Sequence, residues 1–96
     1  MEKKIPKASF IIPTKNNAGT IEQCLNSLLR YRESIKDIIV VDGQSTDGTL
    51  DIVRKFPVKI LADPGKGQNL AYEIGWRNSE GDIVIFMDAD AYLGEG

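Results

Sequence analysis

Two uninterrupted apolar runs, at residues 38–41 (IIVV) and 83–87 (IVIFM), constrain the fold of this chain more than any other feature. Neither run alternates apolar with polar residues, and for the run at 38–41 this pattern is typical of a strand that is buried on both faces of a parallel sheet. Parallel strands need a crossover segment between them, which is usually a helix. The two runs therefore predict an α/β protein.

Short β-type runs and amphipathic stretches alternate along the whole chain. Strands are expected at 8–12, 38–41, 58–61 and 83–87, and helices at about 20–32, 49–55 and 68–78. In the first helix Ile21, Leu25 and Leu28 share one face, and Thr20 with Gln23 resembles a capping box at its start. The order β-α-β-α-β-α-β with short connections predicts a Rossmann-like parallel sheet with helices on both faces.

Composition narrows what such a domain can do. The chain has 96 residues, which is enough for one domain but not for two. It has no His and a single Cys, Cys24, which excludes a serine–histidine triad, a His-ligated zinc site and an internal disulfide. Its 12 Lys and Arg against 14 Asp and Glu give a net charge of −2, so no nucleic-acid-binding surface is expected. Its apolar runs are too short to cross a membrane.

Polar residues follow every predicted strand. In chain order they are residues 13–17 (PTKNN), Asp42, Asp63, Asp88 and Asp90. Ligands of open parallel sheets bind outside the carboxyl ends of the strands, so these groups are expected to converge at one edge of the sheet. Asp is also a common loop and cap residue. We favour that interpretation for Asp47 and Asp51. For Asp42 or Asp63 taken alone, a loop or cap role and a role in binding a ligand are equally good explanations.

Asp88 and Asp90 differ from the other acidic residues because they follow five consecutive apolar residues. In extended chain, two carboxylates two residues apart point to the same side, where their charges repel each other. A divalent cation with oxygen ligands removes that repulsion, and Mg²⁺ commonly binds one or two carboxylates together with substrate phosphates. The pair therefore predicts a metal ion that bridges the protein to an anionic diphosphate.

The segment 65–67 (GKG) before the third predicted helix is not a dinucleotide-binding fingerprint. That motif follows the first strand and contains a third Gly. Lys66 at a helix start could approach phosphate oxygens. A simple turn with an exposed Lys explains the segment equally well.

Three segments together resemble the successive signatures of family-2 glycosyltransferases, which have the GT-A fold. They are residues 10–17 (FIIPTKNN), 39–49 (IVVDGQSTDGT) and 81–90 (GDIVIFMDAD). Each motif alone is weak, whereas three in this order and spacing are strong. The resemblance implies that residues 1–7 are a short lead-in. Residues 8–96 would form the N-terminal, nucleotide-diphosphosugar-binding half of such a fold, as a truncated form.

The resemblance implies an enzyme that transfers a sugar from a nucleotide diphosphate donor with inversion, using Mg²⁺ or Mn²⁺. Asp88 and Asp90 match the DxD motif of the family, which holds the metal ion and the diphosphate and ribose of the donor. The metal would act as a Lewis acid on the departing diphosphate. The residues expected to line the donor site are Pro13, Thr14, Lys15, Asn16, Asp42, Gly43, Asp63, Lys66, Gly67, Asp88, Ala89 and Asp90.

The chain departs from the family pattern in two ways. Many members carry a second Asp, which often reads the base, where this chain has Gly43, so uridine and guanosine both stay open. Family catalytic domains also continue well beyond the DxD motif, with the acceptor site and the general base in that later part. Only six residues follow Asp90 here. The catalytic base is therefore expected outside this chain, which would leave the chain unable to transfer sugar alone.

Two other functions fit parts of the pattern. A phosphatase of the haloacid-dehalogenase type also has an apolar strand that ends in DxD. In that family the motif follows the first strand, and Thr or Val stands where this chain has Tyr92. The second alternative is a non-catalytic nucleotide- or metal-binding module, or an assembly piece that completes a site with another chain.

The expected partners are a UDP- or GDP-linked sugar, an unknown acceptor and a second copy of the chain. A homodimer is expected because a half-fold would expose the edge of the strand at 83–87, and exposed edges invite pairing. We expect a cytoplasmic location, with any membrane association provided by a parent protein or by the acceptor.

Overall fold

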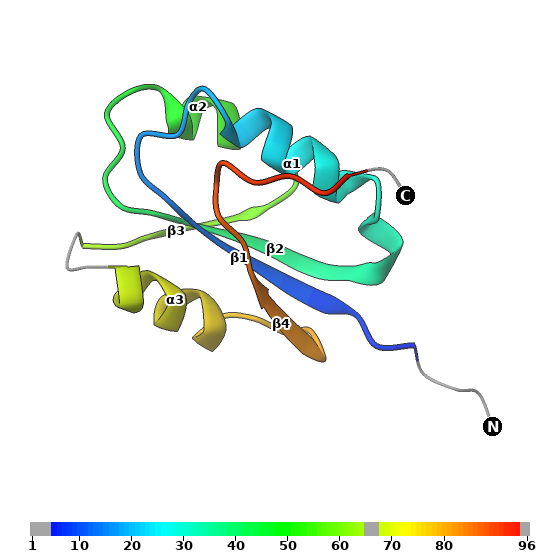
Figure 1. The fold of residues 1–96 in the computed structure, drawn as a ribbon. Helices are drawn as coiled ribbons and strands as arrows, with labels where there is room; N and C mark the ends of the chain where they lie inside the picture. The colour runs from blue at the N-terminus through cyan, green and yellow to red at the C-terminus, as the bar shows by residue number, and fades with distance from the viewer. Residues whose placement is uncertain (1–4, 65–67, 95–96) are drawn as a thin grey trace.

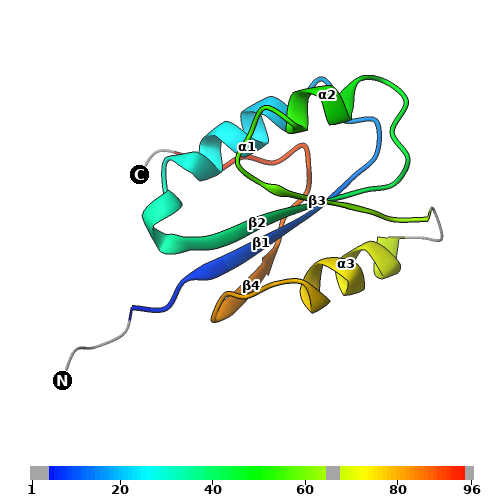
Figure 2. The same ribbon diagram turned by 180° about the vertical axis from the view of Figure 1, so that it is seen from behind.

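Four parallel strands form one sheet in the order β3-β2-β1-β4 in the computed structural model, which describes residues 5–64 and 68–94. The strands are β1 (Ala8–Thr14), β2 (Ile35–Asp42), β3 (Lys59–Ala62) and β4 (Ile83–Phe86). The helices are α1 (Ile21–Leu29), α2 (Thr49–Val53) and α3 (Gln68–Arg77), with a short 3-10 turn, η1 (Arg32–Ser34), before β2. Helices α1 and α2 cover one face and α3 covers the other (Figure 1, Figure 2). The predicted Rossmann-like architecture is confirmed.

The two central strands bury side chains on both faces. Phe10, Ile12 and Val40 pack toward α1 and α2, whereas Ile11 and Ile39 pack toward α3. Consecutive residues of a strand point to opposite faces, so a strand covered on both sides needs apolar residues at every position. This is why the run at 38–41 does not alternate, and all four of its residues are buried.

Strand β1 does not stop at Pro13, as the sequence suggested, but continues to Thr14. Successive residues of a parallel strand bond to alternate neighbours. Thr14 O accepts a hydrogen bond from Gly43 N on the β2 side at 2.7 Å, and Ile11 O accepts one from Met87 N on the β4 side at 3.0 Å. Pro13 therefore faces the β4 side at a level where β4 has already ended.

The start of α1 differs from the predicted capping box, because Thr20 makes no side-chain capping bond. Asn17 O instead accepts hydrogen bonds from Thr20 N at 3.0 Å and from Ile21 N at 2.9 Å. A backbone turn therefore begins this helix. The helix ends at Leu29, earlier than expected, and η1 carries the chain into β2.

Gly75 allows α3 to lie directly on β1. A Cβ atom added at this position would lie 2.3 Å from Cγ2 of Ile11, a side chain with no exposed area in the core beneath α3. Any larger residue would push the helix away from the sheet. The backbone contact between α3 and β1 is thus specified by one glycine.

Strand β4 forms an open edge of the sheet, because it pairs with β1 on one side and with no described strand on the other. The side chains of Ile83, Ile85 and Phe86 are 50%, 38% and 51% exposed. Phe86 packs edge-on against Tyr72 of α3, with ring centroids 4.7 Å apart. The chain after β4 turns back along α1 (Figure 1). Among the described residues, no helix is both long and apolar enough to span a membrane.

Candidate functional site

The carboxyl ends of three strands are joined by backbone hydrogen bonds. Gly43 N donates to Thr14 O at 2.7 Å, and Asp63 N donates to Asp42 O at 2.8 Å. We call this end of the sheet the carboxyl edge. Three of these residues, Thr14, Asp42 and Asp63, are almost completely buried. The structure therefore brings together three of the residues predicted from the strand ends, on a backbone that the sheet holds in place.

Asp42 is bound within its own loop. Its Oδ1 accepts a hydrogen bond of 2.6 Å from Ser45 Oγ, and its Oδ2 accepts one of 3.0 Å from Ser45 N. Only 5% of Asp42 is exposed. The carboxylate therefore organises the loop after β2, and it offers a ligand little surface in this arrangement. Ser45 is a residue of this edge that sequence reasoning did not single out.

The loop after β1 presents Lys15 and Asn16 to solvent. Asn16 has a left-handed backbone, with φ of 53°. Its N–H donates to Ser45 Oγ at 2.9 Å, and its Oδ1 accepts a hydrogen bond from Thr46 N at 2.8 Å. The preceding Lys15 N donates to Asn17 Oδ1 at 2.9 Å. Asn tolerates this backbone region better than most residues, and here it ties the first loop to the second.

Asp88 and Asp90 lie on a turn directly beyond β4. The turn closes with a hydrogen bond of 3.0 Å from Ala91 N to Asp88 O, so the chain is not extended here as the sequence argument assumed. Ala89 between them is 5% exposed, whereas both acidic residues are exposed. The buried alanine anchors the turn in the core beside α1. Because Ala89 points into the core, the carboxylates on either side of it remain available to a ligand.

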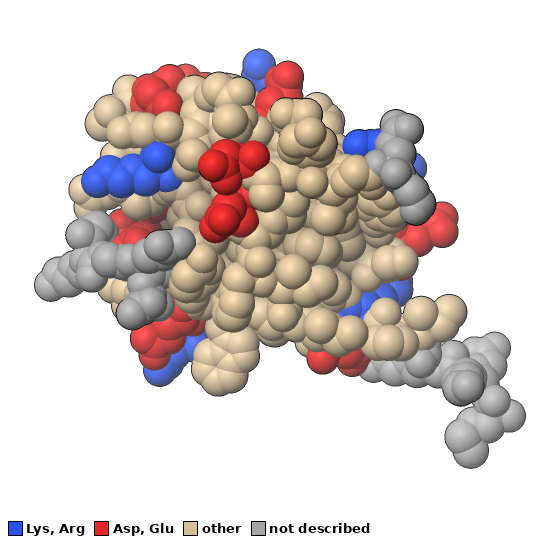
Figure 3. All heavy atoms as spheres, viewed as in Figure 1, with Lys and Arg blue, Asp and Glu red and all other residues tan. Residues whose placement is uncertain are grey.

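Acidic side chains are prominent on this face of the molecule. Figure 3 shows them exposed over the segment that follows β4, with a largely uncharged surface over β4 itself. Exposed carboxylates in this position attract cations and repel a free diphosphate. An anionic ligand therefore needs a bridging cation to bind here.

The donor set fits Mg²⁺ or Mn²⁺ that is shared with a phosphate ligand. Two exposed carboxylates supply hard oxygen ligands, and substrate phosphates or water commonly complete the shell of such an ion. The described part of the chain contains no cluster of three or more His, Cys, Asp or Glu that could hold a metal by itself. Asp88 and Asp90 are therefore suited to a metal that arrives with its ligand.

Cys24 of α1 lies beneath this turn. Its thiol is 3.8 Å from the carbonyl oxygen of Asp88 and is fully buried. Burial, helped by the nearby negative charge of Asp90, raises the pKa of the thiol to about 11. The thiol is therefore protonated at neutral pH, and it acts as a core residue.

Two further residues predicted for the donor site, Lys66 and Gly67, lie outside the described residues. The sequence suggested Asp47 and Asp51 as loop or cap residues, and the structure gives each of them further contacts. Asp51 is exposed and pairs with Arg54 at 3.2 Å on the surface of α2. Asp47 bonds across to the loop after β1, through a hydrogen bond of 3.1 Å from Ala18 N.

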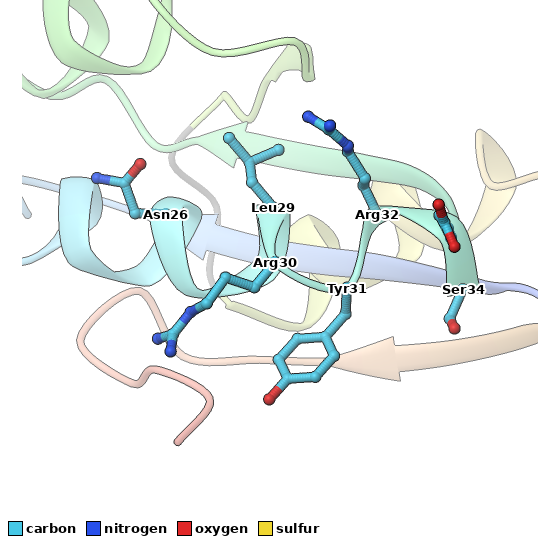
Figure 4. Close-up of a pocket in the computed structure, with 7 residues that line it drawn as sticks. Asn26, Leu29, Arg30, Tyr31, Arg32 and Ser34 are labelled. Atoms are coloured by element: carbon cyan, nitrogen blue, oxygen red, sulfur yellow. The ribbon is translucent and has the colours of Figure 1, made fainter. Parts of the chain in front are cut away.

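A shallow pocket of about 530 Å³ lies at the other end of the molecule, around the end of α1 and η1 (Figure 4). Two of its side chains bind the returning C-terminal segment. Tyr31 donates from its hydroxyl to Gly94 O at 2.9 Å, and Arg30 donates to Leu93 O at 3.4 Å. These groups fasten the chain end over α1. The carboxyl edge, rather than this pocket, therefore gathers the residues that could bind a ligand.

Comparison with known families gives a direct match. The sequence pattern described as Glycosyl transferase family 2 matches residues 9–96. The glycosyltransferase AglE of Haloferax volcanii is 35% identical over 98 residues, which cover 94% of this chain and 32% of that protein. The poly(ribitol-phosphate) β-N-acetylglucosaminyltransferase TarS of Staphylococcus aureus is 35% identical over 99 residues, 91% of this chain and 17% of that protein.

Solved structures give the same answer for the fold. A mannosyltransferase from Pyrobaculum calidifontis, in complex with GDP-Man and Mn²⁺, superposes with a TM-score of 0.85 at 30% identity. The match covers 96% of this chain and 30% of that one. TarS in complex with UDP superposes with a TM-score of 0.80 at 33% identity, over 90% of this chain and 28% of that one. The chain spans about a third or less of these relatives. It belongs to glycosyltransferase family 2 and has the GT-A fold.

Proposed function

We propose that this chain forms the donor-binding part of an inverting, metal-dependent glycosyltransferase, and that it binds a nucleotide diphosphate sugar at the carboxyl edge. The observation that carries the proposal is the position of Asp88 and Asp90. They are exposed on a turn beyond β4, and the ends of β1, β2 and β3 meet at the same end of the sheet. The base, the diphosphate and the metal would then bind next to one another along the carboxyl edge.

Each part of the edge has a distinct task in this proposal. The loops after β1 and β2 hold the nucleoside, with Pro13 and Gly43 among the residues that line it. Asp88 and Asp90 bind Mg²⁺ or Mn²⁺ together with the diphosphate. When bound, the metal offsets the negative charge that builds up on the departing diphosphate. The protein side chains hold the donor in place and keep its phosphates next to the cation.

The bound ligands of two relatives support a nucleotide but do not select the base. The mannosyltransferase structure contains GDP-Man and Mn²⁺, and the TarS structure contains UDP. Gly43 adds no side chain that could distinguish a uracil from a guanine. We therefore propose a UDP- or GDP-linked donor for this chain.

The phosphatase alternative has lost its basis. Its motif would follow the first strand, whereas here the DxD turn follows β4, at the other side of β1, and the family match is to glycosyltransferases. The non-catalytic binding module stays as the second hypothesis. Both functions require donor binding, and only transfer of sugar to an acceptor separates them.

Thermal unfolding in the presence of nucleotides tests the proposal. A ligand that binds only the folded state stabilises it by RT ln(1 + [L]/Kd), which is about 2.7 kcal/mol when the ligand is at 100 times its Kd. We expect UDP or GDP to raise the melting temperature in the presence of Mn²⁺, and to raise it much less without the metal. AMP with Mn²⁺ serves as the control. An unchanged melting temperature with every nucleotide and metal combination would contradict donor binding.

We also propose that the chain forms a homodimer through the open edge of β4. On its outer side the strand pairs with no described strand, and the side chains of Ile83 and Ile85 are exposed there. Such an edge pairs readily with a second copy. Sedimentation velocity is expected to show a dimer whose fraction rises with concentration. The variant Ile85→Lys, which adds a charge to the edge, is expected to lower that fraction, whereas Tyr31→Lys is not. A strictly monomeric chain over a wide concentration range would refute the dimer.

A further inference from the structure

The loops after β1 and β2 are tied together by side chains of the second loop. Asp47 accepts a hydrogen bond of 3.1 Å from Ala18 N at its Oδ2. Its Oδ1 accepts hydrogen bonds from Thr49, one from the backbone N–H at 3.1 Å and one from the hydroxyl. One carboxylate therefore joins the start of α2 to the chain that leads into α1.

Thr49 extends this connection by one more bond. Its Oγ1 accepts a hydrogen bond of 2.9 Å from Asn17 N while it donates to Asp47. The Thr49 side chain is completely buried, so water does not replace these partners. Asp47 and Thr49 together hold two consecutive backbone amides of the first loop, those of Asn17 and Ala18. We call this set of contacts the loop clamp.

The loop clamp acts on segments that hold unusual backbone conformations. Asn16, which precedes the two clamped amides, has φ of 53°, and Gln44 in the facing loop has φ of 68°. Left-handed backbone is unfavourable for most residues with a side chain, and it persists only where the surroundings hold it. Asn16 in turn binds Ser45, the residue that holds both oxygens of Asp42. The loop clamp and Asp42 therefore lie in one connected network.

A helix cap alone does not explain these contacts. Asp47, one residue before the N-cap Gly48, does accept a hydrogen bond from Thr49 N at the start of α2, but such a local bond needs no contact with another loop. The bonds from Asn17 and Ala18 cross more than 28 positions of sequence, from the first loop to the second. Hydrogen bonds from Thr49, first of all from its hydroxyl, hold the pKa of Asp47 below its usual value. The carboxylate therefore stays ionised at neutral pH and accepts all of these bonds.

We infer that Asp47 and Thr49 are positioning residues for the nucleotide, because they hold the loop after β1 against the loop after β2 at the carboxyl edge. This inference rests on the proposed function. Neither residue needs to touch the ligand. A loop that is already in its binding conformation loses less entropy when the ligand binds, and this raises affinity. Without the loop clamp, a more mobile loop makes the same contacts to the nucleotide, and the affinity is lower because more entropy is lost on binding.

Four variants of the chain test this inference. Asp47→Asn removes the charge and one acceptor, and Thr49→Val removes the hydroxyl at nearly unchanged volume. Thr49→Ser restores the hydroxyl and serves as the conservative rescue. Asp51→Asn, an exposed carboxylate on the same helix, is the matched control. Two readouts apply to each variant, the Kd for UDP or GDP with Mn²⁺ and the hydrogen-exchange rates of the Asn17 and Ala18 amides.

In Asp47→Asn and Thr49→Val, the amide hydrogens of Asn17 and Ala18 are expected to exchange faster than in the unmodified chain. Both variants are also expected to bind nucleotide about tenfold more weakly, which is the effect of losing one or two hydrogen bonds. Thr49→Ser and Asp51→Asn are expected to retain the affinity of the unmodified chain, although Thr49→Ser loses a buried methyl group and some stability. This pattern separates positioning from stability, since a purely structural role would lower affinity only where the fold is lost.

The two hypotheses fail in different ways. If the unmodified chain binds nucleotide but Asp47→Asn and Thr49→Val bind it equally well, the positioning role is wrong and the proposed function stands. If exchange at Asn17 and Ala18 is unchanged in those variants, the loop clamp itself is refuted. If the unmodified chain binds neither UDP nor GDP with Mn²⁺, the proposed function is overturned, and a positioning role for the donor is overturned with it.

Discussion

The double variant Asp88→Asn, Asp90→Asn is expected to bind UDP or GDP in the presence of Mn²⁺ on the order of 100-fold more weakly than the unmodified chain, a loss of about 2.7 kcal/mol. Asparagine has nearly the same shape as aspartate but no charge, so it is a poor ligand for a hard cation. Both side chains are exposed, and the turn is anchored by buried Ala89. The melting temperature without ligand is therefore expected to stay nearly unchanged.

The sharper expectation concerns the metal. Titration calorimetry of the double variant should give similar weak affinities with and without Mn²⁺, whereas the unmodified chain should gain affinity from the metal. The control variant Glu33→Gln, Glu80→Gln removes the same amount of charge at the amino ends of β2 and β4, where both residues are exposed. It should bind like the unmodified chain. Full Mn²⁺ dependence in the Asp88, Asp90 variant would show that the metal is held elsewhere.

Gly75→Ala is expected to lower the free energy of unfolding by about 3 kcal/mol, at the upper end of the usual cost of overpacking a core. The added methyl group would lie 2.3 Å from Ile11 Cγ2, and the same side chain offers two more atoms within 3.2 Å. Ile11 is fully buried between α3 and its neighbours, so it has no free direction in which to move. Urea denaturation followed by circular dichroism measures the loss.

Two further variants test whether the loss comes from this steric conflict. Gly19→Ala adds a methyl group at an exposed position with no atom within 4 Å, and its effect is expected to stay within about 0.5 kcal/mol. Ile11→Ala removes the atoms that clash, so the double variant with Gly75→Ala should be more stable than the sum of the two single losses by about 1 kcal/mol or more. Additive losses in the double variant would contradict the contact between these residues.

The sequence alone predicted the layers of this fold, and the reasons can be traced to particular residues. The buried run that contains Val40 and Val41 does not alternate apolar with polar residues, because helices cover both faces of β2. Ile21, Leu25 and Leu28 do lie on the buried face of α1. Local patterns of burial repeat along a single element, so they can be seen without knowing what the element packs against. Such patterns therefore located the four strands and three α-helices among the described residues, but not the short turn η1.

The end points of elements and the roles of single polar residues could not be predicted in this way. Pro13 reads as a strand terminator, and only the early end of β4 on the neighbouring side makes it acceptable inside β1. Thr20 reads as a cap, yet Asn17 O begins the helix. Both outcomes depend on where a distant or adjacent segment lies. The conformational preferences of single residues do not reveal where such a segment lies.

The candidate site shows the same division. Its acidic residues were found from their positions after strands, but the loop clamp was not, because Asp47 binds Ala18 across a gap in sequence that no local motif spans. Asp88 and Asp90 were expected to point to the same side of an extended chain, whereas they lie on a turn around buried Ala89. The residue types pointed to the chemistry. The partners of each side chain had to come from the structure.

The location of the metal is the central claim, and paramagnetic broadening in ¹⁵N-labelled chain tests it most directly. With Mn²⁺ and UDP or GDP present, the amide signals of Thr14, Gly43 and residues 88–91 should lose intensity, because Mn²⁺ at the carboxyl edge relaxes nearby nuclei. Signals of Glu33 and Gly81, at the amino end of the sheet, should persist. Loss of signal at the amino end instead, uniform loss over the chain, or no loss at all would contradict a metal-bridged donor site at Asp88 and Asp90.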